Sequence, residues 1–265
     1  MSEDTAANPP APVPFDPSAY PDPEHVVHED VDALAAAAAA AIAAILADTR
    51  ERLGRPGRVS LTGGGAGLRT ARELAALEID WSGVEIHFGD ERFVARDDPE
   101  RNSTQIAAAL PAAFGAATVV DWPAPGDRGA QDVDEAAASF AAAHPLPAGD
   151  EPYFDAFCLG MGGEGHVNSV FPDSPQVLAG EDGHAAEDIM AVHDCPKPPP
   201  ERMTYTLGVV RRSRNVLLLV AGEEKAEAVA AASAAGADPV QWPAAGARGL
   251  EATTWYLDRG SASRL

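Results

Sequence analysis

The sequence predicts an α/β fold, with a mainly parallel open sheet and helices on both of its faces. Short apolar, β-branched runs alternate with alanine-rich helical stretches along the chain. This alternation is typical of parallel sheets built from strand–helix–strand units. Two of the runs lead into glycine-rich segments, at residues 62–67 and 160–165. Such segments lie where open α/β sheets bind their ligands, just past the carboxyl ends of strands.

The chain divides into a short tail and one domain. Its 265 residues suit one large or two small domains. No internal stretch is richer in Pro, Gly and Ser than an ordinary loop, whereas residues 1–23 begin with acids, hold seven prolines and lack an apolar run. We expect a disordered or loosely packed tail over 1–25, without the features of a secretion signal. A single α/β domain should cover 26–265.

The first predicted helix is the alanine-rich run at 33–47. Its fifteen uncharged residues are fewer than a membrane span needs, and alanine is only weakly apolar. Asp30 and Asp32 precede the run and Arg50 and Arg52 follow it, which complements a helix dipole. We therefore expect a helix of a soluble domain and no membrane partner.

A strand at 58–61 comes next, followed by the glycine segment TGGGAG and a predicted amphipathic helix at 68–77. A glycine loop that enters a helix presents free backbone N–H groups and the positive end of the helix dipole to an anion. Gly63, Gly64 and Gly65 are therefore candidate phosphate ligands. The segment matches neither a Walker loop nor GxGxxG. A tight strand-to-helix turn without a ligand is the alternative.

Two further segments supply positive charge. A strand at 84–88 runs into GDER at 89–92, and residues 195–202 read CPKPPPER, a stiff polyproline segment. Arg92 and Lys197 are candidate clamps for an anion. The alternatives are an Arg92 that pairs with a neighbouring acid and a Lys197 that is only a solvated surface charge.

The most informative segment is FDAFCLGMGGEGHVNSVFPDS at 154–174. An apolar strand ends in glycines, and His166 follows two residues after Glu164. The strand delivers His166 to the edge of the sheet where chemistry is usually done, and a nearby carboxylate can orient an imidazole. A glycine-rich turn with an incidental surface histidine is the alternative. The remaining predicted strands are at 117–120, 188–192, 203–207, 215–220 and 253–257, and the remaining helices at 99–110, 132–142 and 223–234.

Composition limits the partners. A net charge of −22 disfavours nucleic acid and anionic membrane surfaces, whereas an anionic small molecule stays possible because distant charges are screened. The two cysteines give no disulfide framework, so we expect a cytoplasmic protein. No cluster has metal-ligand spacing, and no metal or organic cofactor is expected. The oligomeric state stays open, with a monomer favoured.

Together these motifs resemble the 6-phosphogluconolactonase family, which shares its fold with glucosamine-6-phosphate deaminases. The resemblance rests on TGGG, GDERFV with Asn102-Ser103 downstream, GMGGEGHVNSVFP and PKPPPERMTYT, in the family's order over roughly 26–258. The chain departs from the family at two points. Gly65-Ala66-Gly67 stands where the family has Ser-Thr-Pro, and Glu164 replaces the aspartate of Asp-Gly-His.

The resemblance implies hydrolysis of 6-phospho-D-glucono-1,5-lactone in the oxidative pentose phosphate pathway, with a phosphorylated sugar lactone as the small-molecule partner. It places His166 as the general base and Glu164 as the group that orients it. The substrate-binding residues are then Gly63, Gly64, Gly65, Asp90, Arg92, Lys197 and Arg202.

A serine hydrolase is disfavoured because G-x-S-x-G is absent. An amino-sugar-phosphate deaminase carries a glutamate where this chain has Phe171. A noncatalytic sugar-phosphate-binding protein is the third alternative.

Overall fold

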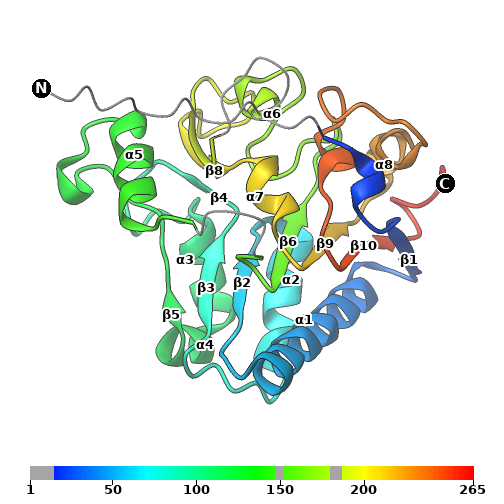
Figure 1. Ribbon diagram of the computed structural model, residues 1–265, viewed down its shortest axis with the longest axis horizontal. Coiled ribbons are helices and arrows are strands. Elements are labelled where there is room, and N and C mark those ends of the chain that lie inside the picture. The colour runs from blue at the N-terminus through cyan, green and yellow to red at the C-terminus, as the bar shows by residue number, and fades with distance from the viewer. Residues whose placement is uncertain (1–14, 147–151, 180–186) are drawn as a thin grey trace, which may run out of the picture.

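The computed structural model describes residues 15–146, 152–179 and 187–265. Within these residues, a parallel sheet of seven strands has the order β1-β10-β9-β6-β2-β3-β5, and a smaller antiparallel sheet has the order β4-β8-β7 (Figure 1). The parallel strands are β1 (Glu24–His28), β2 (Arg58–Leu61), β3 (Glu85–Phe88), β5 (Thr118–Val119), β6 (Ala156–Gly160), β9 (Asn215–Val220) and β10 (Ala252–Asp258). The antiparallel strands are β4 (Asp90–Arg92), β7 (Ile189–Val192) and β8 (Arg202–Tyr205).

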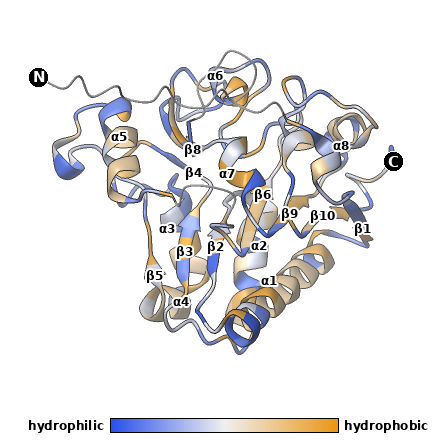
Figure 2. Ribbon diagram, viewed as in Figure 1, coloured by the Kyte–Doolittle hydropathy of each residue, from blue (hydrophilic) through white to orange (hydrophobic). Residues whose placement is uncertain are grey.

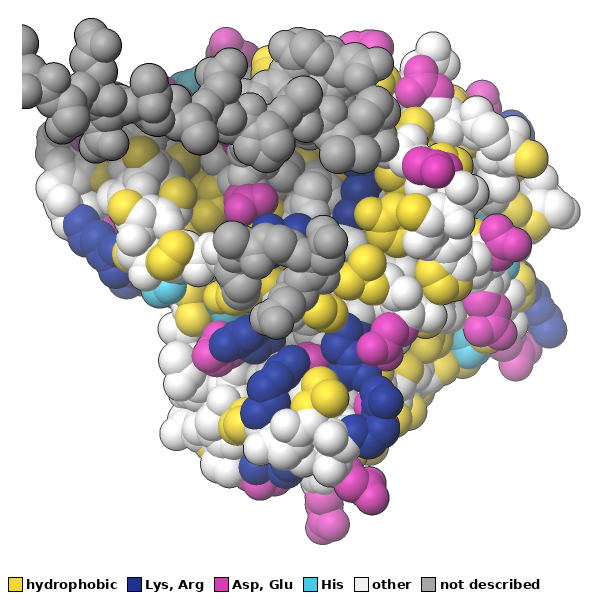
Figure 3. Space-filling model, in the orientation of Figure 1, with side chains coloured by type: hydrophobic (Ala, Val, Ile, Leu, Met, Phe, Trp, Pro, Cys, Tyr) yellow, Lys and Arg dark blue, Asp and Glu magenta, His cyan; other side chains and the backbone are white. Residues whose placement is uncertain are grey.

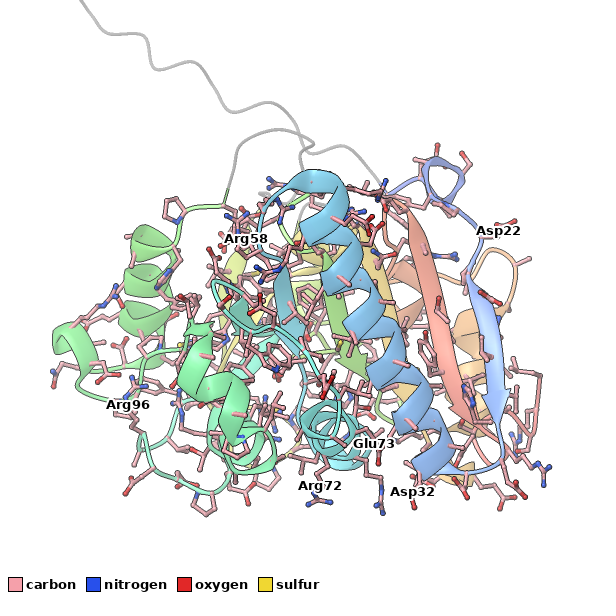
Figure 4. All side chains as sticks on the ribbon, turned by 90° about the horizontal axis from the view of Figure 1, so that it is seen from below. Asp22, Asp32, Arg58, Arg72, Glu73 and Arg96 are labelled. Carbon is pink, nitrogen blue, oxygen red and sulfur yellow. The ribbon has the colours of Figure 1, made fainter. Side chains whose placement is uncertain are left out.

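Helices cover both faces of the parallel sheet. Seen from below, α1 and α2 lie beside each other in front of the sheet, and α8 lies behind it (Figure 4). The predicted mainly parallel α/β fold is therefore confirmed. The α-helices are α1 (Val31–Leu53), α2 (Gly64–Ala75), α3 (Asn102–Ala109), α4 (Pro111–Ala116), α5 (Val133–Ala143), α6 (Pro175–Leu178), α7 (Leu207–Arg211) and α8 (Ala226–Ser233). The 3-10 turns are η1 (Pro17–Ala19), η2 (Asp127–Gly129), η3 (Glu223–Lys225) and η4 (Pro243–Gly246).

The central strands are buried on both faces. Every residue of β6 except its last is buried, as is every residue of β9 except its first. Continuous apolar sequences such as NVLLLV suit strands that helices cover on both sides. These two strands are neighbours, so they fix the edge of the sheet at which their loops meet.

Helix α1 is apolar over most of its length and hydrophilic at its lower end in Figure 2. Asp30 caps it by accepting hydrogen bonds from the N–H groups of Asp32 and Ala33. Among the described residues, it is the one helix long and apolar enough to cross a membrane. Its buried stripe includes Leu34, Ile42 and Leu46, and it packs on α2, β9 and β10. This packing is that of a helix that lies along one face of the sheet.

The structure corrects several predicted elements. The segments at 188–192 and 203–207 form the antiparallel sheet with β4 rather than joining the parallel sheet. The predicted helix at 68–77 already begins at Gly64, so most of the expected glycine loop is its first turn. The parallel edge strand β1 was not predicted. Residues 1–14 of the predicted tail lie outside the described residues. From Phe15 onward the predicted tail packs on the domain: the Arg211 guanidinium lies 4.0 Å from the centre of the Phe15 ring.

The amino ends of the parallel strands carry a buried carboxylate. Asp155, which precedes β6, is 0% exposed and accepts a 2.8 Å hydrogen bond from the backbone N–H of Arg58. It also pairs with Arg55 at 2.8 Å and with Arg214 at 3.3 Å. Figure 3 shows basic side chains lying among acidic ones on the lower part of the visible face. The carboxylate of Asp155 thus ties together β2, β6 and β9 at this end of the sheet.

Candidate active site

A cleft of about 490 Å³ lies at the carboxyl ends of β2, β3, β6 and β9. The segments that follow these strands line it, as expected for an open α/β sheet. All but one of the residues predicted for the site line this cleft: Gly63, Gly64, Gly65, Asp90, Arg92, His166, Lys197 and Arg202. The exception, Glu164, contacts two of them directly.

The loop after β6 holds His166 in a closed turn. The N–H of Gly162 donates to the carbonyl of His166 at 3.1 Å, and Met161 bridges Val167. A β-carbon on Gly162 would lie 2.2 Å from the His166 ring and 2.6 Å from the Glu164 carboxylate. Glycine is needed there because the imidazole and carboxylate occupy the space of a side chain.

His166, Glu164 and Lys197 form a charged chain. Nδ1 of His166 lies 3.2 Å from Oε1 of Glu164 without the alignment of a hydrogen bond, so we treat the contact as electrostatic. Nζ of Lys197 lies 2.9 Å from the same oxygen. The Glu164 carboxylate therefore lies beside the His166 ring, as the sequence suggested. Lys197 forms an ion pair with Glu164 and is not a lone surface charge.

Burial governs the protonation of these groups. The His166 side chain is 14% exposed. Burial lowers its pKa below the usual 6.5, the Lys197 ammonium lowers it further, and Glu164 partly opposes both. Burial raises the pKa of Glu164, but its hydrogen bond to Lys197 and the charges of His166 and Lys197 lower it overall. Near neutral pH the imidazole is therefore unprotonated beside an ionised carboxylate, which is the state a general base requires.

An aromatic ring covers one face of the imidazole. The rings of His166 and Phe171 stack with centroids 4.4 Å apart and an interplanar angle of 27°. Phe171 is 6% exposed and packs with Val192 and Cys195. This contact fixes the plane of the His166 ring and excludes water from that side.

The glycine turn after β2 forms another part of the wall of the cleft. Gly63 is the N-cap of α2, and Gly64 and Gly65 are its first two residues; among the described residues, no side chain caps the helix. Its first N–H groups are therefore available to an anion in the cleft. A β-carbon on Gly63 would lie 2.1 Å from Oδ1 of Asn102, so the side chain of Asn102 packs directly against this turn.

The three predicted substrate-binding residues on β4 and β8, which are Asp90, Arg92 and Arg202, make different contacts. The Arg92 guanidinium donates to the carbonyl of Glu100 and faces the cleft, so it pairs with neither Asp90 nor Glu91. Asp90 accepts hydrogen bonds from Asn102 and Ser169. Arg202 is 5% exposed and donates to the carbonyls of Lys197, Pro198 and Pro199, which holds the proline segment that carries Lys197.

Among the further residues that line the cleft, four polar ones were not assigned to it by sequence reasoning: Asn102, Asn168, Glu224 and Lys225. Lys225 follows β9 and is half-buried, and burial lowers its pKa. Its place after a strand end was a usable signal. Asn168 has a left-handed φ of 50° and its Oδ1 finds no hydrogen-bond partner among the described residues. Nothing in the sequence predicted that conformation.

Comparison with known proteins gives one consistent result. The profile of the family described as glucosamine-6-phosphate isomerases/6-phosphogluconolactonase matches residues 29–255. A 6-phosphogluconolactonase of Mycobacterium tuberculosis is 46% identical over 221 residues, covering 78% of this chain and 84% of that protein. One from Streptomyces coelicolor is 40% identical over 259 residues, covering 92% and 95%. The solved 6-phosphogluconolactonase of Trypanosoma brucei superposes with a TM-score of 0.75 at 22% identity, covering 92% of this chain and 99% of that one; at that identity the likeness supports the fold alone.

Proposed function

This chain belongs to the family of glucosamine-6-phosphate isomerases and 6-phosphogluconolactonases, and on that premise we propose that it hydrolyses 6-phospho-D-glucono-1,5-lactone to 6-phospho-D-gluconate. This reaction is a step of the oxidative pentose phosphate pathway. The observation that carries the proposal is the position of His166, held between Glu164 and Phe171 in the cleft that Arg92, Lys197 and Lys225 also line. The names of relatives at 40–46% identity support the same activity.

The reaction needs a base, an acid and a place for the phosphate. Because Nδ1 of His166 faces Glu164, Nε2 is the nitrogen we assign to catalysis. It takes a proton from water as the water oxygen bonds to C1 of the lactone and the π electrons of the carbonyl move to its oxygen. When this oxyanion re-forms the carbonyl and the bond from C1 to the ring oxygen breaks, the same nitrogen returns the proton to the ring oxygen. Glu164 stabilises the transient imidazolium.

The phosphate is held by charge and by backbone donors. We assign it to Arg92, Lys197 and the N–H groups of Gly63, Gly64 and Gly65, with Lys225 contributing positive charge. Asp90 and Arg202 serve the site by holding Asn102, Ser169 and the proline segment. These local cations explain how a chain of net charge −22 binds an anion, because distant surface charges are screened.

The direct test is a coupled assay. Glucose-6-phosphate dehydrogenase generates the lactone in place, and the appearance of 6-phosphogluconate is followed with and without this protein. We expect appearance well above the spontaneous rate. Appearance at the spontaneous rate, with the phosphosugar nevertheless bound, would favour the noncatalytic sugar-phosphate-binding alternative.

The deaminase alternative has its own test. A deaminase of this family needs a proton-transferring glutamate, and here Phe171 stacks on His166 instead. We expect no ammonia from glucosamine 6-phosphate, and we expect Phe171→Glu not to create that activity, because a charge placed in the apolar contact with Val192 and Cys195 disturbs the ring of His166. Ammonia release by the unmodified protein, measured with glutamate dehydrogenase, would reverse this exclusion.

Activity should survive metal chelation. Within the described residues, no three His, Cys, Asp or Glu side chains are grouped as a metal site requires. We therefore expect the rate of lactone hydrolysis to be unchanged after dialysis against EDTA. A loss that a divalent cation restores would contradict the mechanism.

We also propose that the protein is cytoplasmic and monomeric. The free thiols of Cys158 and Cys195 agree with a reducing compartment.

A further inference from the structure

A buried carboxylate lies directly behind the cleft and has no part in the chemistry described above. Glu91 is 0% exposed and sits on β4 between Asp90 and Arg92, both of which line the cleft. Its side chain turns to the start of α3. The nearest cation is Arg101, whose Nε lies 3.9 Å away. A fully buried carboxylate is costly unless its oxygens are well paired.

Backbone N–H groups supply that pairing. Oε1 of Glu91 accepts from the N–H of Arg92 at 2.9 Å and of Asn102 at 2.7 Å, and Oε2 accepts from the N–H of Ser103 at 2.9 Å. Asn102 and Ser103 are the first two residues of α3, whose own N-cap residue, Arg101, makes no capping hydrogen bond. Glu91 therefore caps α3 from a different element, where the helix dipole favours a negative charge.

The contacts continue from α3 into the cleft. Nδ2 of Asn102 donates to the carbonyl of Asp90 at 2.9 Å and to its carboxylate at 3.2 Å. Oδ1 of Asn102 occupies the space where Gly63 would carry a β-carbon. A displacement of the first turn of α3 would therefore move Asn102 against the glycine turn of α2. It would also shift Glu100, whose carbonyl accepts from the Arg92 guanidinium.

We propose that Glu91 is a positioning residue of this site, whose carboxylate holds β4 and the first turn of α3 together so that Arg92 and Asn102 face the glycine turn. The inference rests on the proposed function, because it takes Arg92 and the glycine turn to hold the substrate phosphate. The side chain of Glu91 joins β4 to the start of α3, and Asn102 extends the contact to Gly63 at the start of α2. Its removal should loosen the phosphate subsite while leaving His166, on the loop after β6, in place.

The test compares Glu91→Gln with Asp155→Asn. Glutamine keeps the shape of Glu91 but places an amide N–H₂ against a backbone donor and removes the charge. Asp155 is equally buried and also accepts a backbone N–H, but it lies at the amino ends of the strands. Both variants should melt at lower temperature. Only Glu91→Gln should weaken the binding of 6-phosphogluconate, by roughly tenfold or more, and raise KM by a similar factor with kcat nearly unchanged.

Glu91→Asp is the second variant, in case Glu91→Gln folds poorly. It keeps the buried charge but draws the carboxylate back by one methylene group, so it should also raise KM. A folded variant at position 91 that binds 6-phosphogluconate as tightly as the native protein, despite a lower melting temperature, would overturn the inference. A native protein that neither binds 6-phosphogluconate nor hydrolyses the lactone would instead overturn the proposed function.

Discussion

Replacing His166 by asparagine should lower kcat by about 10²–10⁴-fold, the usual contribution of a positioned general base. Asparagine keeps a polar group against Glu164 but cannot accept and return a proton. The binding of 6-phosphogluconate should change little, because we assign the phosphate to Arg92, Lys197 and the glycine turn. The coupled assay gives kcat and calorimetry gives the dissociation constant of the product.

The pH dependence provides an independent check on His166. Burial and Lys197 lower its pKa below 6.5, so the basic form persists to lower pH than in a free histidine. The kcat/KM of the native protein should rise with pH through a group titrating below 6.5 and then level off. That limb should disappear in His166→Asn. Full turnover in a folded His166→Asn protein would end the assignment and leave a water activated by Glu164 as the next candidate.

Replacing Arg92 by alanine should weaken the binding of the phosphorylated substrate by roughly ten- to a hundredfold, because charge-assisted hydrogen bonds are worth about 1.5–3 kcal/mol. Glucono-1,5-lactone without the phosphate should be hydrolysed by the variant as well as by the native protein. The comparison of KM values for the two lactones isolates the contribution of the phosphate.

Arg96→Ala is the matched control for Arg92→Ala. Arg96 lies four residues further along the chain, points away from the core (Figure 4) and pairs with Asp121 and Asp127. It does not line the cleft, so both lactones should keep their kinetic constants. Equal losses on the two lactones in Arg92→Ala would remove Arg92 from the phosphate subsite and place it either at the reacting carbonyl or in the scaffold.

The central strands could be predicted because burial dictates their composition. β9 was predicted with its observed bounds at 215–220, and β2 at 58–61, since both are short apolar runs between turn signals. The edge strand β1 reads EHVVH and is only partly buried, so its sequence carried no such signal. The sequences of the short strands β4 and β7 gave no indication that each pairs with β8 in a separate sheet. Pairing partners depend on contacts that are distant in the sequence.

The site could be predicted where a residue directly follows a strand, and less well where packing decides its role. His166 follows β6, and the glycine turn follows β2. Arg92 lies on β4, just past the end of β3. The structural role of Arg202 depends on three carbonyls of a loop that folds back on it. Asn102 was noted only as part of a motif, because its contact with Gly63 exists only once α3 and α2 are packed together.

A crystal structure with bound 6-phosphogluconate tests the central claim most directly, since the product is stable and carries both ends of the substrate. We predict the phosphate beside Arg92, Lys197 and the N–H groups of the glycine turn. The carboxylate at C1, which derives from the lactone carbonyl, should lie within hydrogen-bond distance of Nε2 of His166. A product bound with its phosphate at that nitrogen, or bound outside the cleft, would contradict the proposed orientation and with it the role of His166.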